Sequence, residues 1–156
     1  MVVNEWLPTS MRGGAIVRKL TAGQVLFSVG DRAAGLYEVV SGKVRITRID
    51  SAGRELVLRV ARAGDSFGEP SIFSPIYNTS AEAATPAVVR FYRKAVLLAE
   101  FARNPQFAQS FMALLARKAV DLVTRLERLN IHSARDRVRH YLAVGAEAGT
   151  IALPGT

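Results

Sequence analysis

Residues 55–69 read Glu-Leu-Val-Leu-Arg-Val-Ala-Arg-Ala-Gly-Asp-Ser-Phe-Gly-Glu, and this stretch decides the fold of the first half of the chain. Leu56, Leu58 and Val60 alternate with Val57 and Arg59, which is the period of a half-buried strand. On this phase Arg59 points outward. Turn signals recur about every ten residues, as in sheets built from short strands. They lie at Ala22-Gly23, Gly30-Asp31, Ser41-Gly42, Ala52-Gly53 and Ala63-Gly64. The pattern predicts an all-β sandwich, roll or barrel from Ala15 to about Tyr92.

The end of this stretch, Phe67-Gly68-Glu69, forms a candidate binding motif with Ser80-Ala81. A carboxylate beside a glycine can accept hydrogen bonds from a ribose hydroxyl. A hydroxyl with nearby backbone N–H groups can face a phosphate. Together they suit a cyclic phosphodiester sugar. The alternative for Glu69 is a structural carboxylate bonded to neighbouring loop N–H groups, and for Ser80 an ordinary strand hydroxyl.

From Pro105 the apolar period changes from two to alternating steps of four and three. The seam consists of Ala108, Met112, Leu115, Ala119, Leu122, Leu126 and Leu129. Such a seam is typical of a coiled coil, and its roughly 33 Å length exceeds what one small roll could cover. A second stripe of Phe107, Phe111 and Leu114 should pack on the chain's own β domain. Asn104 should cap this helix, and we expect a parallel homodimer through it.

Ser133 is expected to cap a new helix, which makes Ile131-His132-Ser133 a candidate hinge. The predicted organisation is therefore a β-roll in residues 1–104, a dimerisation helix in 105–131 and a hinge helix with an onward linker in 132–156. A short strand is expected at residues 150–154. The fold class is mainly β with α, a double-stranded β-helix of the jelly-roll kind followed by these helices.

The composition excludes several kinds of chemistry. The 156 residues contain no cysteine and two histidines, and the net charge is +8. Without cysteine there are no disulfides and no thiolate metal sites. The strand half contains no histidine, so a cupin metal cluster or a hydrolytic triad lacks its ligands or base, and no enzyme is expected. No metal site, membrane span or secretion signal is expected, and the cytoplasm is the expected location.

The ordered motifs resemble the Crp/Fnr family of bacterial transcription regulators. The matching segments are Gly30-Asp31-Arg32-Ala33, Leu36 to Val44, Gly64-Asp65, Phe67-Gly68-Glu69 and Ser80-Ala81. The resemblance implies a cyclic-nucleotide-binding-like sensor domain, with an effector held between the roll and the long helix. It also implies a C-terminal winged helix-turn-helix that binds DNA. That module should begin just after Pro154, and we expect it to be absent from this chain.

The resemblance places Gly68, Glu69, Thr79, Ser80 and Ala81 on the effector pocket, with Leu58, Leu122 and Val123 as its walls. Two departures bear on the effector. Members that bind cAMP have an arginine where Thr79 stands, and hydroxyl residues where Leu122 and Val123 stand. Loss of a buried charge-assisted contact costs about 2–5 kcal/mol. We therefore expect an unidentified small-molecule effector other than cAMP.

Haem is not expected as the effector, because His132 and His140 lie in the expected hinge region and not on the roll. Arg59, Arg117, Arg125 and Arg128 are possible substitutes for the missing cation. The expected function is effector sensing and dimerisation in a Crp/Fnr-type regulator. The alternative is a regulatory module that acts through protein partners without binding DNA.

Overall fold

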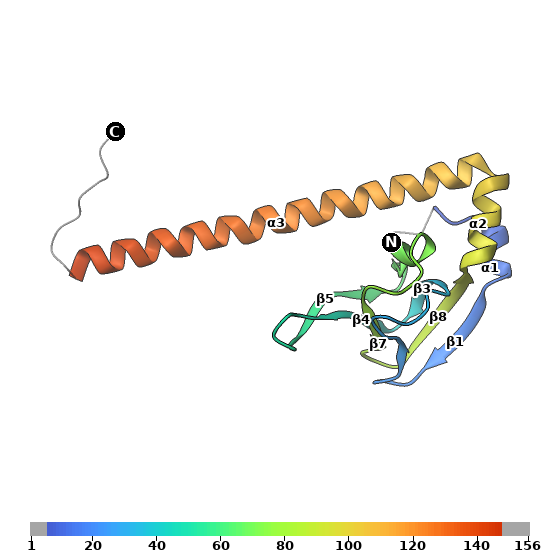
Figure 1. The fold of residues 1–156 in the computed structure, drawn as a ribbon, viewed down its shortest axis with the longest axis horizontal. Coiled ribbons are helices and arrows are strands. Elements are labelled where there is room, and N and C mark those ends of the chain that lie inside the picture. Colours follow the sequence, from blue (N-terminus) through green and yellow to red (C-terminus); the bar gives the residue numbers. More distant parts are fainter. Residues whose placement is uncertain (1–5, 148–156) are drawn as a thin grey trace. The chain divides into compact units, whose positions relative to one another are not determined.

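The computed structural model describes residues 6–147. These residues divide into two compact units, one up to Phe111 and the other from Met112 onward. The first unit contains all of the strands described, and the second contains most of one long helix (Figure 1).

The first unit is a roll made of two four-stranded antiparallel sheets (Figure 1). One sheet has, in order, β1 (Ile16–Leu20), β8 (Ala87–Arg93), β3 (Gly35–Ser41) and β6 (Ser66–Phe67). The other has β2 (Val25–Phe27), β7 (Ser80–Ala83), β4 (Lys43–Ile49) and β5 (Glu55–Arg62). Strands adjacent in the sequence often lie in different sheets, as in a jelly roll. The predicted fold class is confirmed.

The core between the sheets is built around contacting aromatic rings. Phe27 stacks on Tyr77 with ring centroids 3.8 Å apart, and Tyr37 stacks on Phe67 at 5.2 Å. Aliphatic side chains from facing strands fill the remaining space: Val39, Val44, Ile46 and Val89 are all buried. The glycines of the five predicted turns all have positive φ, between 79° and 91°. The turn prediction is therefore confirmed, because glycine adopts this conformation without a steric cost.

Two short helices were not predicted from the sequence: α1 (Thr9–Gly13) and α2 (Lys94–Arg103). Helix α2 follows β8 directly and buries Leu97 against the roll. Helix α3 (Pro105–Glu147) begins where expected, and the Asn104 Oδ1 accepts a hydrogen bond from the Phe107 N–H at 3.1 Å. Trp6 stacks on Phe107, with ring centroids 6.0 Å apart. Trp6 therefore packs on the first turn of α3.

The expected break near Ser133 is absent, because α3 is continuous from Pro105 to Glu147. The prediction of a separate helix from Ser133 is wrong. No glycine or proline lies between Pro105 and Val144 to interrupt the helix. A serine inside a helix costs only about 0.5 kcal/mol relative to alanine, too little to end it. The strand expected at 150–154 lies outside the described residues, and a hinge role for 131–133 stays a prediction.

The two apolar stripes of α3 differ in burial. Phe107, Phe111 and Leu114 are buried, with 2%, 2% and 8% of their surface exposed. Phe107 and Phe111 contact the ring of Phe101 within the first unit, as expected for the second stripe. Of the seam residues, Ala108 and Leu115 are half-buried, and the others are exposed in the single chain. The largest exposures belong to Met112, Leu122, Leu126 and Leu129, at 59% to 65%. An apolar row of this length on a helix surface is typical of an interaction site.

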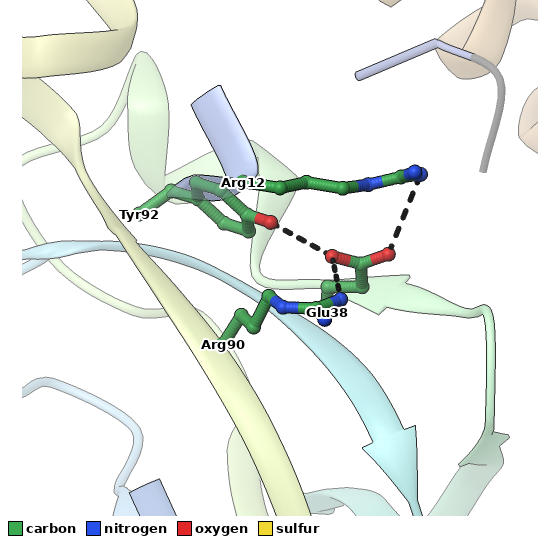
Figure 2. Close-up of polar contacts among 4 residues, drawn as sticks. All are labelled: Arg12, Glu38, Arg90 and Tyr92. Atoms are coloured by element: carbon green, nitrogen blue, oxygen red, sulfur yellow. Dashed lines mark hydrogen bonds and ion pairs between the residues drawn. The ribbon is translucent and has the colours of Figure 1, made fainter. Parts of the chain in front are cut away.

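A buried carboxylate links the N-terminal segment to the roll (Figure 2). Glu38 of β3 is only 4% exposed. Its Oε2 accepts a hydrogen bond from the Tyr92 hydroxyl at 2.8 Å and from Arg90 at 3.4 Å. Its Oε1 lies 3.7 Å from the Arg12 guanidinium of α1. Burial and the bond to Glu38 raise the pKa of Tyr92. The two guanidinium groups balance, and the Tyr92 hydroxyl solvates, a charge that would otherwise be costly to bury.

Candidate functional site

Strand β5 departs from the predicted alternation because it contains a β-bulge. Ile46 pairs with Arg59 and Thr47 pairs with Val57, so Leu58 is an extra residue opposite β4. A bulge shifts the side chains on one side of it by one position. As a result Arg59 is half-buried, and its Nη2 donates a hydrogen bond to the carbonyl oxygen of Ser66. The prediction that Arg59 points outward is wrong.

The Phe67-Gly68-Glu69 motif forms a sharp corner between β6 and the short 3₁₀ helix η1 (Glu69–Ile72). Gly68 has a φ of 83°, which allows the chain to turn there. Glu69 is 5% exposed, and its Oε1 accepts a hydrogen bond from the Ser66 hydroxyl at 2.5 Å. The Ser71 hydroxyl donates to the carbonyl of Gly35 at 2.9 Å and fastens η1 to β3. The carboxylate is therefore held in a defined position.

The second part of the motif begins strand β7. The Ser80 Oγ accepts a hydrogen bond from the Val29 N–H at 3.0 Å, and Ala81 is fully buried. Thr79, which precedes them, is half-buried. Ser80 therefore has a structural bond to the loop after β2, in agreement with the strand-hydroxyl interpretation. Whether it also faces an effector stays a prediction.

The structure brings the two parts of the motif to one aromatic cluster. Phe27 pairs with Ala81 in the β2–β7 ladder. The centroid of its ring lies 6.2 Å from that of Phe67. Gly68 follows Phe67 directly, and a Cβ added to it would lie 3.6 Å from Tyr77. Tyr77 in turn stacks on Phe27. Gly68, Glu69, Ser80 and Ala81 therefore belong to one region of the roll.

The three residues expected to form the walls of the pocket are all exposed in the single chain. Leu58 occupies the bulge and is 46% exposed. Leu122 and Val123 lie in the second unit, at 60% and 54% exposure. Their role as walls of an effector pocket stays a prediction. Arg59 is the residue that sequence reasoning placed wrongly, because nothing in the alternating pattern marks the bulge.

The described part of the chain lacks two other kinds of feature, a cluster of metal ligands and a membrane-spanning helix. No group of three or more metal-ligating side chains occurs among the residues whose positions are described. Within the same residues, no helix combines the length and apolar character needed to cross a bilayer. The two histidines lie in α3, and their side chains are outside the described set.

Comparison with known proteins agrees with the arrangement of the roll. Residues 17–104, more than half of the chain, match the family model described as the cyclic nucleotide-binding domain. The chain belongs to this family. Its relatives include regulators of the Crp/Fnr type, so the resemblance seen in the motifs is confirmed. The site at Gly68 and Glu69 lies within the matched region of this cyclic nucleotide-binding domain.

Three comparisons show the extent of the similarity. The cyclic AMP receptor protein of Thermus thermophilus is 33% identical over 122 residues, which cover 77% of this chain and 56% of that protein. A CRP-like cAMP-activated global transcriptional regulator of Mycobacterium tuberculosis is 36% identical over 98 residues, which cover 62% and 43%. The crystal structure of the Thermus thermophilus catabolite activator protein matches with a TM-score of 0.69 and 30% identity, covering 90% of this chain and 67% of that one. The chain spans about half the length of the curated relatives it matches.

Proposed function

We propose that residues 1–156 form the effector-sensing and dimerisation region of a Crp/Fnr-type bacterial transcription regulator whose effector is not cAMP. In this proposal the chain is not an enzyme, works in the cytoplasm, and contacts DNA through residues outside this segment. The observation that carries the proposal is the Ser66–Glu69 corner in a cyclic nucleotide-binding fold in which Thr79 stands beside Ser80-Ala81.

The argument against cAMP rests on charge. A cyclic phosphate carries a negative charge, and Thr79 offers only a hydroxyl where cAMP-binding members of the family offer a guanidinium. The missing contact corresponds to a roughly 30- to 3000-fold loss of affinity. The names of the relatives connect them with cAMP, so this departure is the point to test.

The test is isothermal titration calorimetry of cAMP against the wild-type chain and Thr79→Arg. We expect no micromolar binding to the wild type and an affinity at least about 30-fold higher for Thr79→Arg. Asn78→Arg is the matched control, because it adds the same charge at the exposed neighbouring position and should gain little. A micromolar dissociation constant for the wild type would overturn the exclusion of cAMP.

The homodimer is proposed from the seam on α3. Leu122, Leu126 and Leu129 expose 60% or more of their surface in the single chain. Their spacing is that of residues that pack between two parallel helices. In the proposed regulator, an effector bound to the roll would change how two such helices pack. Sedimentation velocity of the wild-type chain tests the dimer directly.

A further inference from the structure

We infer that Arg59 is the anion-binding residue of the effector site, and that the effector carries a phosphate or carboxylate group that this guanidinium meets. The inference rests on the proposed sensing function and names the chemistry of its ligand. It follows from the bulge in β5, from the position of Arg59 in the sheet, and from the partners of the arginines in the roll.

The strand register directs Arg59 toward the inside of the roll. Arg59 pairs with Ile46 of β4, and Ile46 pairs with Ala81 of β7. Residues paired in one row of an antiparallel sheet point to the same face. Ile46 and Ala81 are buried in the core, at 6% and 0% exposure. Arg59 therefore lies in the same row as the Ser80-Ala81 motif, two strands away, or roughly 10 Å across the sheet.

The guanidinium of Arg59 also reaches the other half of the motif. It donates to the carbonyl of Ser66, whose hydroxyl donates to Glu69. Ser66 belongs to β6, the edge strand of the first sheet, while Arg59 belongs to β5, the edge strand of the second. The side chain thus joins the two sheet edges. It lies close to the buried carboxylate of Glu69, to which it is linked through Ser66.

The other half-buried arginines of the roll each lie beside a carboxylate that balances their charge, and Arg59, within the described residues, does not. Among residues 6–111, four arginines are half-buried: Arg12, Arg45, Arg59 and Arg90. Arg12 and Arg90 lie 3.7 and 3.4 Å from Glu38, and Arg45 lies 3.3 Å from Glu82. For Arg59 the described residues provide a carbonyl oxygen and no carboxylate within ion-pair distance. A carbonyl satisfies one donor but does not neutralise the charge, which an anionic ligand would do.

The test is calorimetry of the 156-residue chain and three variants against a fixed set of probes. The probes are cAMP, cGMP, 5′-AMP and succinate, with adenosine as the uncharged control. The variants are Arg59→Gln, Arg59→Lys and Arg62→Gln. Arg62 lies on the same strand but is exposed, so Arg62→Gln is the matched control. We expect at least one anionic probe to bind, and the phosphates against succinate distinguish the two anion classes.

The expected result is an affinity for that probe at least about 10-fold lower in Arg59→Gln than in the wild type, with a smaller loss in Arg59→Lys and none in Arg62→Gln. Equal affinity in the wild type and Arg59→Gln would overturn the inference and leave the sensing function standing, with Arg59 only joining the sheet edges. Binding of adenosine but of no anion would do the same. Absence of binding by every probe would also overturn the inference, while the sensing function, which names no particular effector, would stand.

Circular dichroism of each variant controls for folding. If Arg59→Gln does not fold, two other measurements test the inference: the salt dependence of probe affinity in the wild type, and the affinity of Arg59→Lys for the same probe. Affinity that falls as salt rises, and that Arg59→Lys largely keeps, supports the inference. Affinity that is independent of salt overturns it.

Discussion

The roll and the long helix differ in where they place their apolar side chains. In the roll, Leu36, Phe67 and Val89 expose at most 1% of their surface, so the two sheets complete a core of their own. In the helix from Met112 onward, Leu122 and Leu126 each expose 60%. The roll has the packing of an independent domain, whereas the helix exposes an apolar row of the kind found at interaction sites. Changes to the roll should therefore affect folding, and changes to the helix should affect association.

The largest effect is expected from Leu126→Asp. A carboxylate at the centre of the proposed seam would lose its hydration without gaining a partner, at a cost of about 3–5 kcal/mol in dimer stability. Sedimentation velocity should show monomers with a folded roll. Val120→Asp is the matched control, since Val120 is also exposed but lies off the seam, and it should remain dimeric. A dimer that persists in Leu126→Asp would reject the seam.

A loss of similar size, in the free energy of unfolding of the roll, is expected from Gly35→Ala. A Cβ at this position would lie 2.0 Å from the carbonyl oxygen of Tyr92, so β3 and β8 would have to move apart. We expect the free energy of unfolding to fall by about 3 kcal/mol. Urea denaturation measures this, and Gly13→Ala, where a Cβ meets nothing within 4 Å, is the control. Equal stability of the two variants would contradict the close packing of the roll.

Alkaline pH should also destabilise the roll selectively. Burial, with a smaller contribution from Tyr77, raises the pKa of Tyr37 to about 12. An unfolded tyrosine has a pKa of about 10, so the folded state binds the phenolic proton more tightly. The stability that this provides is fully present below about pH 10 and is lost as the pH rises through about 12. Urea unfolding across this range, followed by near-ultraviolet circular dichroism, should show the loss, and Tyr37→Phe should reduce it.

Tyr92→Phe should have a moderate effect on the roll. The substitution removes the hydroxyl that donates to the buried Glu38 at 2.8 Å. We expect a loss of about 1–3 kcal/mol in the free energy of unfolding, because a buried carboxylate loses one donor. Arg93→Gln, an exposed neighbour on the same strand, serves as the control in the same urea titration. No difference between the two variants would show that Arg12 and Arg90 suffice for Glu38.

The smallest effect is expected from Ser133→Ala in the helix. In a continuous α3 the substitution should stabilise the helix by about 0.5 kcal/mol, because alanine has the higher helix propensity. If Ser133 capped a separate helix, the same change would instead cost about 1 kcal/mol. Thermal unfolding followed at 222 nm separates the two signs, with Ala134→Ser as the reverse control.

The fold was predictable from the sequence to the extent that local signals report it. The five turn glycines, the cap at Asn104 and the start of α3 at Pro105 all follow from residue chemistry at those positions. The inward direction of Arg59 was not predictable, because the bulge at Leu58 depends on how β4 and β5 pair. The continuity of α3 past Ser133 was missed because a capping residue is tolerated inside a helix when its neighbours favour one.

The candidate site was predictable in part. The corner at Gly68 and the burial of Glu69 agree with the motif, whose glycine and carboxylate are adjacent in the sequence. The bond from Ser66 to Glu69 joins residues three apart, so it has a local signal in the sequence: a hydroxyl and a carboxylate flank a turn. The contact between Arg59 and Ser66 joins the edges of two different sheets, and it requires the folded structure to be seen.

Trp6 gives the protein a built-in optical probe. It is the single tryptophan, it is 4% exposed, and its ring lies 6.0 Å from Phe107 and 5.3 Å from Phe111. Its emission therefore reports the environment at the base of α3 rather than that of the β-sheets. Any effector that loosens this junction should shift the fluorescence to longer wavelength, so an unlabelled sample could be screened in a plate reader before a ligand is identified.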